Sequence, residues 1–284
     1  MKIRFFILSL VSILHFASAG LAKAASDNIT PTELNAKNGG RVWVYLPPNT
    51  SSDAKLSCVL VPPAGSRLFH GMSLSNGDSV EHVPYVSAGF AVVSFDISGA
   101  WPDTGGGAAQ QKAIKEFTNS RGGVDDALLA LKIALEKFSQ IDSKRVFVAG
   151  HSSAATLALQ IAASSPQIQG CVAFAPITDI EARLGIGTLA SLEGNSPGIT
   201  KFLHDTSPSN QIDTLRCPVF LFHADDDTNV PTAAIETFRD ALLTHHKQVK
   251  YVSVSSGGHY NSMIEIGIPK AIIWLKSQGQ EPAK

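Results

Sequence analysis

The apolar residues of this chain gather in short runs, and longer amphipathic stretches separate one run from the next. Short runs rich in Val, Phe and Leu are typical of buried strands, whereas stretches with apolar positions on one face predict helices. The expected strands are residues 41–46, 56–61, 90–95, 170–174, 218–223 and 249–254, with another that begins at Arg145, and the expected helices are residues 123–138, 232–243 and 261–276, with another after Gly150.

This alternation of strands and helices predicts an α/β fold, in which a mostly parallel sheet carries helices on both of its faces. A chain of 284 residues that shows no internal repeat suits one large domain of this kind. We therefore expect a single domain over residues 25–284.

Three stretches depart from the alternation. Residues 25–40 are polar and contain Gly and Asn, so we expect a tail or a first turn there. Residues 101–107 contain a proline and three consecutive glycines, which predicts an irregular loop. Residues 176–211 are rich in Gly and Pro, and we expect a small helical lid-like insertion above the sheet, because loops of such length are usually functional.

The N-terminus has the features of a signal peptide. Lys2 and Arg4 form a basic start, and residues 5–16 are mostly apolar but too short to span a membrane comfortably. Small residues at the right spacing predict cleavage after Ala24, with Ala19 as the alternative site. Residues 1–24 are then removed and the protein is secreted or periplasmic, without stable membrane insertion. An uncleaved membrane anchor is the alternative.

The composition narrows the function. Hydrophobic residues make up 44% of the chain. The formal net charge is −1, so the chain lacks the basic excess that would indicate a nucleic-acid partner. The three cysteines, Cys58, Cys171 and Cys217, lie in or beside apolar runs, where buried small hydrophobic residues are the default. If one disulfide forms, Cys171 and Cys217 are the preferred pair. No metal-ligand spacing and no cofactor motif is visible, so we expect neither.

A candidate nucleophile lies where the strand that begins at Arg145 gives way to a helix. Gly150, His151, Ser152, Ser153 and Ala154 match the Gly-x-Ser-x-Gly nucleophile elbow, with Ala in the second glycine position. Small residues are needed there because the adjoining strand and helix approach closely. The alternative is that Ser152 simply caps the helix, as serine often does.

Two later turns supply the partners that a serine nucleophile needs, namely an imidazole and a carboxylate. Three adjacent acids, Asp225, Asp226 and Asp227, follow the strand at 218–223, at the edge where open sheets place their sites. His259 follows two glycines after the strand at 249–254. A solvated acidic turn and a loop histidine without a role are the alternatives.

These motifs, in the order Ser, Asp, His, resemble the α/β-hydrolase superfamily, and the resemblance covers roughly residues 55–276. The acid turn of that superfamily often has the pattern His-Gly-x-x-Asp-x-x-Val-Pro. Alignment on Val230 and Pro231 makes Asp227 the acid, and Asp225 and Asp226 then shape the loop. The resemblance therefore implies a catalytic triad of Ser152, Asp227 and His259.

The same resemblance implies an oxyanion hole. One donor is the backbone N–H of Ser153, the residue after the nucleophile. The second donor comes from the loop after the strand at 56–61, where two prolines cannot donate, so Ala64, Gly65 or Ser66 must serve and Gly65 is preferred. Ser98 stands where many relatives carry Arg, which predicts that a usual loop-bracing contact is missing.

The Ser-Pro stretch over residues 207–223 is similar to the prolyl oligopeptidase branch, and dienelactone hydrolases and acetyl esterases are similar neighbours. Peptidases of that branch often carry a β-propeller, for which this chain has no room, so an esterase for small substrates becomes the favoured expectation. The alternatives are a prolyl-oligopeptidase-type peptidase acting on short peptides and a non-catalytic binding protein. Substrate choice is expected to depend on residues 67–70, 101–107 and 176–211, and Phe69, Trp101 and Tyr260 are candidates to line a pocket.

Overall fold

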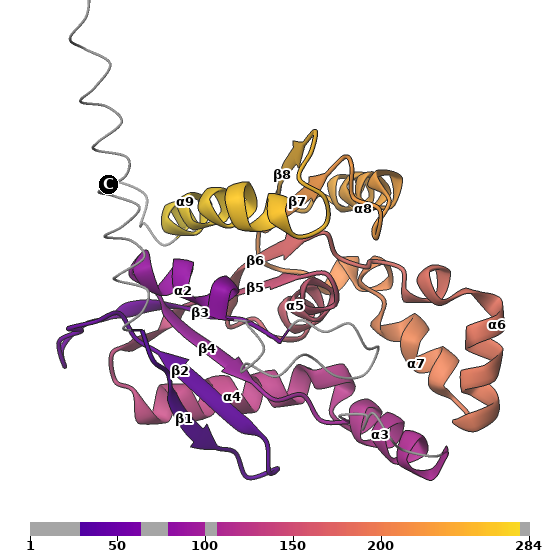
Figure 1. Cartoon of the computed structure of the whole chain (residues 1–284), viewed down its shortest axis with the longest axis horizontal. Coiled ribbons are helices and arrows are strands. Elements are labelled where there is room, and N and C mark those ends of the chain that lie inside the picture. Colours follow the sequence, from indigo (N-terminus) through magenta and orange to yellow (C-terminus); the bar gives the residue numbers. More distant parts are fainter. Residues whose placement is uncertain (1–28, 64–78, 100–106, 279–284) are drawn as a thin grey trace, which may run out of the picture.

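An eight-stranded sheet forms the centre of the computed structural model, which describes residues 29–63, 79–99 and 107–278 (Figure 1). The strand order is β1-β2-β4-β3-β5-β6-β7-β8. β1 and β2 are antiparallel to each other and β2 is antiparallel to β4, whereas all other neighbours are parallel, as the alternation of elements predicted. The strands are β1 (Thr32–Asn35), β2 (Arg41–Tyr45), β3 (Leu56–Leu60), β4 (Ala91–Phe95), β5 (Ile141–His151), β6 (Ile168–Phe174), β7 (Val219–Ala224) and β8 (Val249–Val254).

Helices cover both faces of the sheet, which explains why the central strands are apolar throughout (Figure 1). Successive side chains point to opposite faces. In β5, Val148 packs with one face cluster, beneath α4 (Val124–Lys137), α5 (Ser153–Ser164) and α8 (Thr232–Thr244). Its neighbour Phe147 packs with the other cluster, beneath α2 (Ser79–Ser87) and α9 (Ile268–Gln278).

The parallel strands bring three distant loops to one edge of the sheet. His151 at the end of β5 pairs with Phe174, and Ala224 at the end of β7 pairs with Val254 at the end of β8. The residues that follow these strands therefore emerge side by side, which is where open parallel sheets place ligands.

The first strand was not expected. Residues 32–35 lie in the stretch predicted as a tail or turn, yet they pair with β2 from Thr32 opposite Val44 to Asn35 opposite Arg41. β1 is an edge strand, and its residues are exposed except for the half-buried Leu34, so it lacks the apolar signal of a buried strand.

Residues 176–211 are helical, as expected, and contain α6 (Ile180–Asn195), α7 (Ile199–Thr206) and one short 3₁₀ turn (Pro208–Asn210). They pack on α3 (Gly107–Asn119), a helix that was not predicted, through an apolar cluster separate from the two sheet faces. α6 is broken at Gly185, whose φ is 74°. Before the break, the Arg183 guanidinium donates to the Asn229 carbonyl oxygen at 2.7 Å, which ties α6 to the turn after β7.

The closing helix expected at 261–276 is present but irregular. A π-helical turn over Met263–Gly267 precedes α9. Gly267 lies so close to the sheet that a Cβ there would be 3.0 Å from the Phe174 ring. The wider π turn thus coincides with a point where backbone packs directly on aromatic side chains.

The loop after β4 has Ser98 in place of the usual arginine, so the contact of that arginine is missing, as the sequence predicted, but another residue braces the loop. Asp126 in the first turn of α4 is 5% exposed and accepts hydrogen bonds from the Ser98 N–H, the Ser98 hydroxyl and the Asn38 amide, each at 2.8 Å. The contact of that arginine is absent, as expected, and Asp126 in α4 braces the loop in its place, a partner that the sequence did not suggest.

Replacing Asp126 by Ala should lower the free energy of unfolding by about 3 kcal/mol, because the half-buried Ser98 groups lose a charged acceptor. Urea unfolding measures this. Asp125→Ala is the matched control, because Asp125 is its exposed neighbour and pairs only with Arg121 among the contacts that the structure records, so about 0.5 kcal/mol is expected. Equal losses in the two variants would contradict the bracing role.

Candidate active site

The turn between β5 and α5 has the geometry of a nucleophile elbow. Ser152 adopts φ 56° and ψ −120°, a conformation that non-glycine residues rarely occupy. A Cβ on Gly150 would lie 2.3 Å from the Ala154 carbonyl oxygen, so no side chain fits there. Ala154 itself is 1% exposed. Both positions therefore need small residues, as the sequence pattern suggested.

Ser152 does not act as a capping side chain. It stands at the N-cap position of α5, but its hydroxyl makes no capping hydrogen bond. Its backbone N–H donates to the Phe174 carbonyl oxygen at 2.9 Å, and its carbonyl oxygen accepts from the Thr156 N–H at 3.1 Å. The backbone is thus fixed on both sides, while the hydroxyl is not used to stabilise the helix.

Asp227 is a buried carboxylate in the turn that follows β7. Its Oδ1 accepts from the backbone N–H groups of Asn229 at 2.7 Å and Val230 at 3.0 Å, and its Oδ2 lies 2.7 Å from His259 Nδ1. Burial would raise the pKa of Asp227, but the hydrogen bonds from His259 and the two amides outweigh it and hold the pKa below its usual value. The carboxylate is therefore ionised and oriented.

His223 stabilises this turn from within the core. It is completely buried, and its Nε2 lies 3.0 Å from the Val230 carbonyl oxygen and 4.0 Å from Asp227 Oδ2. The three adjacent acids have different partners. Asp225 accepts a hydrogen bond from the Ser253 hydroxyl, and Asp226 accepts from two loop amides. Only Asp227 contacts the imidazole of His259 among the contacts recorded for these three acids.

His259 lies directly beside the elbow. Its contact with Asp227 requires a proton on Nδ1, which leaves the Nε2 lone pair available as a base. The ring of His151, the residue before Ser152, packs against the His259 ring with centroids 4.5 Å apart. His151 Nε2 also donates to the His259 carbonyl oxygen at 2.7 Å. The structure thus brings the neighbourhoods of Ser152, Asp227 and His259 together.

His151 remains neutral in this position. Burial, aided by the nearby His259, lowers the pKa of His151 to about 4. It therefore adds no positive charge beside His259. The contact of His151 with His259 was not predicted, and Asp226, which was expected to shape the acid loop, bonds to the loop of His259 instead; in both cases the partners are distant in the chain.

The candidate oxyanion donors are described only in part. Ser153 is the first residue of α5, so its backbone N–H lies at the helix N-terminus, directly after Ser152. β3 lies beside β5, with Leu60 opposite Val148, so the loop that follows β3 leaves the sheet next to the elbow. Gly65 lies outside the described residues, as do Ala64, Ser66, residues 67–70 and residues 101–106.

The described residues contain no disulfide, no cluster suited to a metal ion and no helix suited to span a membrane. Cys171 and Cys217 are buried free thiols, as is Cys58, and burial raises the pKa of Cys58 to about 12 and of Cys217 to about 11. Within the described residues, no three His, Cys, Asp or Glu side chains are grouped as a metal site would require. None of the helices in that part of the chain has the length and apolar character needed to cross a bilayer.

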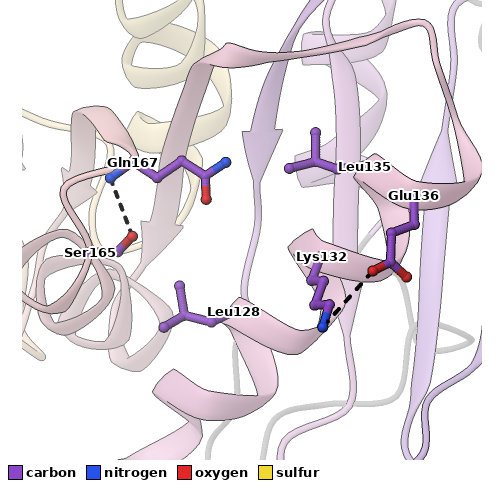
Figure 2. Close-up of a pocket in the computed structure, with 6 residues that line it drawn as sticks. All are labelled: Leu128, Lys132, Leu135, Glu136, Ser165 and Gln167. Carbon is purple, nitrogen blue, oxygen red and sulfur yellow. Dashed lines mark hydrogen bonds and ion pairs between the residues drawn. The ribbon is translucent and has the colours of Figure 1, made fainter.

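A separate pocket of about 480 Å³ lies beside the start of β6, at the opposite end of the parallel strands from the candidate active site. Figure 2 shows the residues that line it. It opens between α4 and the turn that leads into β6. Its polar groups satisfy one another, with Lys132 3.9 Å from Glu136 and the Gln167 N–H donating to the Ser165 hydroxyl. It contains neither a histidine nor an elbow serine, so it is not the candidate active site. Its lining residues are Leu128, Lys132, Leu135, Glu136, Ser165 and Gln167.

Comparison with known proteins agrees with this architecture. A model of the prolyl oligopeptidase family matches residues 78–275, more than half of the chain. No curated protein matches the sequence significantly.

Solved structures share the fold at low sequence identity. An acylaminoacyl peptidase from Pyrococcus horikoshii matches with a TM-score of 0.70 at 14% identity, over 93% of this chain and 44% of that chain. A puromycin-hydrolyzing peptidase from Mycobacterium tuberculosis matches with a TM-score of 0.67 at 18% identity, over 90% and 41%. A 2,6-dihydroxy-pseudo-oxynicotine hydrolase matches with a TM-score of 0.59 at 18% identity, over 90% and 71%. The chain thus spans less than half the length of the two peptidases. These matches confirm the expected α/β-hydrolase fold.

The elbow geometry predicts that Gly150→Ala will cost at least about 3 kcal/mol of folding free energy, because the new methyl group overlaps the α5 backbone. Gly194→Ala is the matched control, because a Cβ there meets nothing within 4 Å and alanine favours helix. Urea unfolding of the two variants checks this. A Gly150→Ala protein as stable as Gly194→Ala would show that the close approach is not a real constraint.

Proposed function

This chain belongs to the prolyl oligopeptidase family of serine hydrolases, and we propose that it cleaves short peptides through an acyl-enzyme on Ser152. The observation that supports this most is the uncapped elbow serine, whose neighbour His151 packs on His259, together with the contact of His259 with the buried Asp227. Ser152 is the nucleophile, His259 the general base and acid, and Asp227 the residue that orients the imidazole.

In this mechanism, His259 Nε2 accepts the proton of the Ser152 hydroxyl as the oxygen attacks the substrate carbonyl carbon. The imidazolium then protonates the leaving amine, and the acyl group remains on Ser152 as an ester. Water attacks this ester with His259 again as the base, which releases the acid. Asp227 holds Nδ1–H throughout, and its charge stabilises the imidazolium.

We assign the oxyanion hole to the Ser153 N–H and to a donor in the loop after β3, with Gly65 as the preferred residue. The start of α5 supports the first assignment, since the helix N-terminus favours negative charge. The position of β3 beside β5 supports the second.

The family assignment favours the peptidase alternative over the esterase that the sequence first suggested. The lack of room for a propeller in this chain does not argue against a peptidase, because the chain corresponds to only 44% and 41% of the two similar peptidases. A small-molecule ester hydrolase is the second candidate. The similar pseudo-oxynicotine hydrolase, which is named for a small-molecule substrate and of which this chain covers 71%, supports that reading.

Ser152→Ala should lose at least about a thousandfold in kcat, because the nucleophile is removed, and should no longer be labelled by a fluorophosphonate probe. Ser153→Ala is the control and should retain labelling, since only its backbone N–H is assigned a function. Labelling that survives Ser152→Ala but not Ser153→Ala would refute the nucleophile. A folded wild-type protein without any label would favour a non-catalytic binding protein.

Substrate class is tested by a panel of aminoacyl p-nitroanilides and p-nitrophenyl esters. A peptidase should hydrolyse at least one anilide in a reaction that Ser152→Ala abolishes. Turnover of esters alone would support the second candidate instead.

We also propose that the protein is exported and that residues 1–24 are removed, on the basis of the basic start and the apolar run that follows it. N-terminal sequencing of protein recovered from the periplasm or medium of a bacterial host should give Ala25 as the first residue. Gly20 would indicate the alternative cleavage after Ala19. An uncleaved Met1 in the membrane fraction would refute export by cleavage.

A further inference from the structure

The loop that carries His259 is held from outside the triad. It follows β8 and contains Gly257 and Gly258, whose φ values of 119° and 62° are both positive. Successive residues in such turn conformations point their N–H groups toward a common point, which forms an anion-binding concavity. Both N–H groups need an acceptor that no regular secondary structure supplies.

The Asp226 carboxylate is that acceptor. Its Oδ2 accepts from the Gly257 N–H at 3.1 Å and its Oδ1 from the Gly258 N–H at 2.7 Å. Each oxygen of the planar carboxylate therefore binds one N–H group, so a single side chain holds both glycines. The contact is possible because the turns after β7 and β8 emerge side by side, with Ala224 opposite Val254.

Ser262 and His151 hold the other side of the loop. The buried Ser262 donates its hydroxyl to the Gly258 carbonyl oxygen at 2.6 Å and its N–H to the Gly257 carbonyl oxygen at 3.0 Å. His151 donates to the His259 carbonyl oxygen at 2.7 Å. The backbone from Gly257 to His259 is thus bonded to the acid turn, the elbow and the closing helical segment.

We propose that Asp226 is a positioning residue that, together with His151, holds the His259 imidazole between Ser152 and Asp227. This rests on the proposed catalytic role of His259. Asp226 touches neither the imidazole nor the serine through any contact recorded for the described residues, so it acts through the loop backbone. Without it, the loop glycines are free to sample other conformations, and the base spends less time in the productive geometry.

Asp225 offers a matched comparison. It is the adjacent acid and is also exposed to solvent, and it accepts a hydrogen bond from the Ser253 hydroxyl within β8 rather than from the loop. A general effect of charge or of turn stability should appear in variants of both acids. A positioning effect should appear only when Asp226 is changed.

The experiment compares Asp226→Ala, Asp226→Asn and Asp225→Ala with the wild type, using p-nitrophenyl acetate and the fluorophosphonate probe. Asp226→Ala should lower kcat and the labelling rate about tenfold with little change in KM, because the proposal gives Asp226 a role in holding the base and none in binding the substrate. Asp226→Asn keeps one acceptor oxygen and should be intermediate. Asp225→Ala should stay within about twofold of the wild type.

Hydrogen exchange and thermal unfolding separate positioning from folding. In Asp226→Ala, amide exchange in a peptide covering residues 255–262 should accelerate, while the unfolding midpoint should match that of Asp225→Ala. His151→Phe keeps a ring of similar shape but loses the donor, and it should also lower kcat.

Equal kcat values for Asp226→Ala and Asp225→Ala would overturn the positioning role, as would unchanged exchange in the 255–262 peptide. The proposed function can fail separately. If the wild type is neither labelled nor active, the triad assignment falls and takes the catalytic part of this proposal with it. Normal labelling of the wild type together with unaffected Asp226→Ala would refute the positioning role alone.

Discussion

The close approach of β5 and α5 is the constraint on which the rest of the site depends. At Gly150 the two backbones come so near that no side chain fits, and Ser152 is held in a conformation that costs of order 1–3 kcal/mol. That cost is offset by the sheet, through the bond from the Ser152 N–H to Phe174, and by the buried Ala154. The strain exposes a hydroxyl that a relaxed helix start would have used as a cap.

The buried carboxylate of Asp227 meets a different constraint, because burial disfavours its negative charge. The protein solves this with donors rather than with a cation. Two amides of the Asp227 turn and the imidazole N–H together outweigh the cost of desolvation. The same turn is fixed from below by His223, so a single loop provides both the charge and its orientation.

Sequence patterning predicted the buried parts of this fold well and the contacts between its loops poorly. The central strands are covered on both faces, so their apolar runs were unmistakable, whereas β1 at the edge has only one half-buried residue and was missed. The order of Ser152, Asp227 and His259 could be inferred from family motifs and strand ends. The contacts of Asp226 with Gly257 and of His151 with His259 join residues 31 and 108 positions apart, and no periodicity reports on such pairs.

The break in α6 at Gly185 divides this helix into two parts that differ in one contact. Both parts contribute to the apolar cluster with α7 and α3, through Ile180 before the break and Leu192 after it. Among the contacts recorded for the described residues, only the first part is hydrogen-bonded to the acid turn, through Arg183 and Asn229. Substitutions after Gly185 can therefore change the surface of the insertion while the hydrogen bond from Arg183 to the acid turn is kept, so insertions with different surfaces can share one anchor beside the carboxylate.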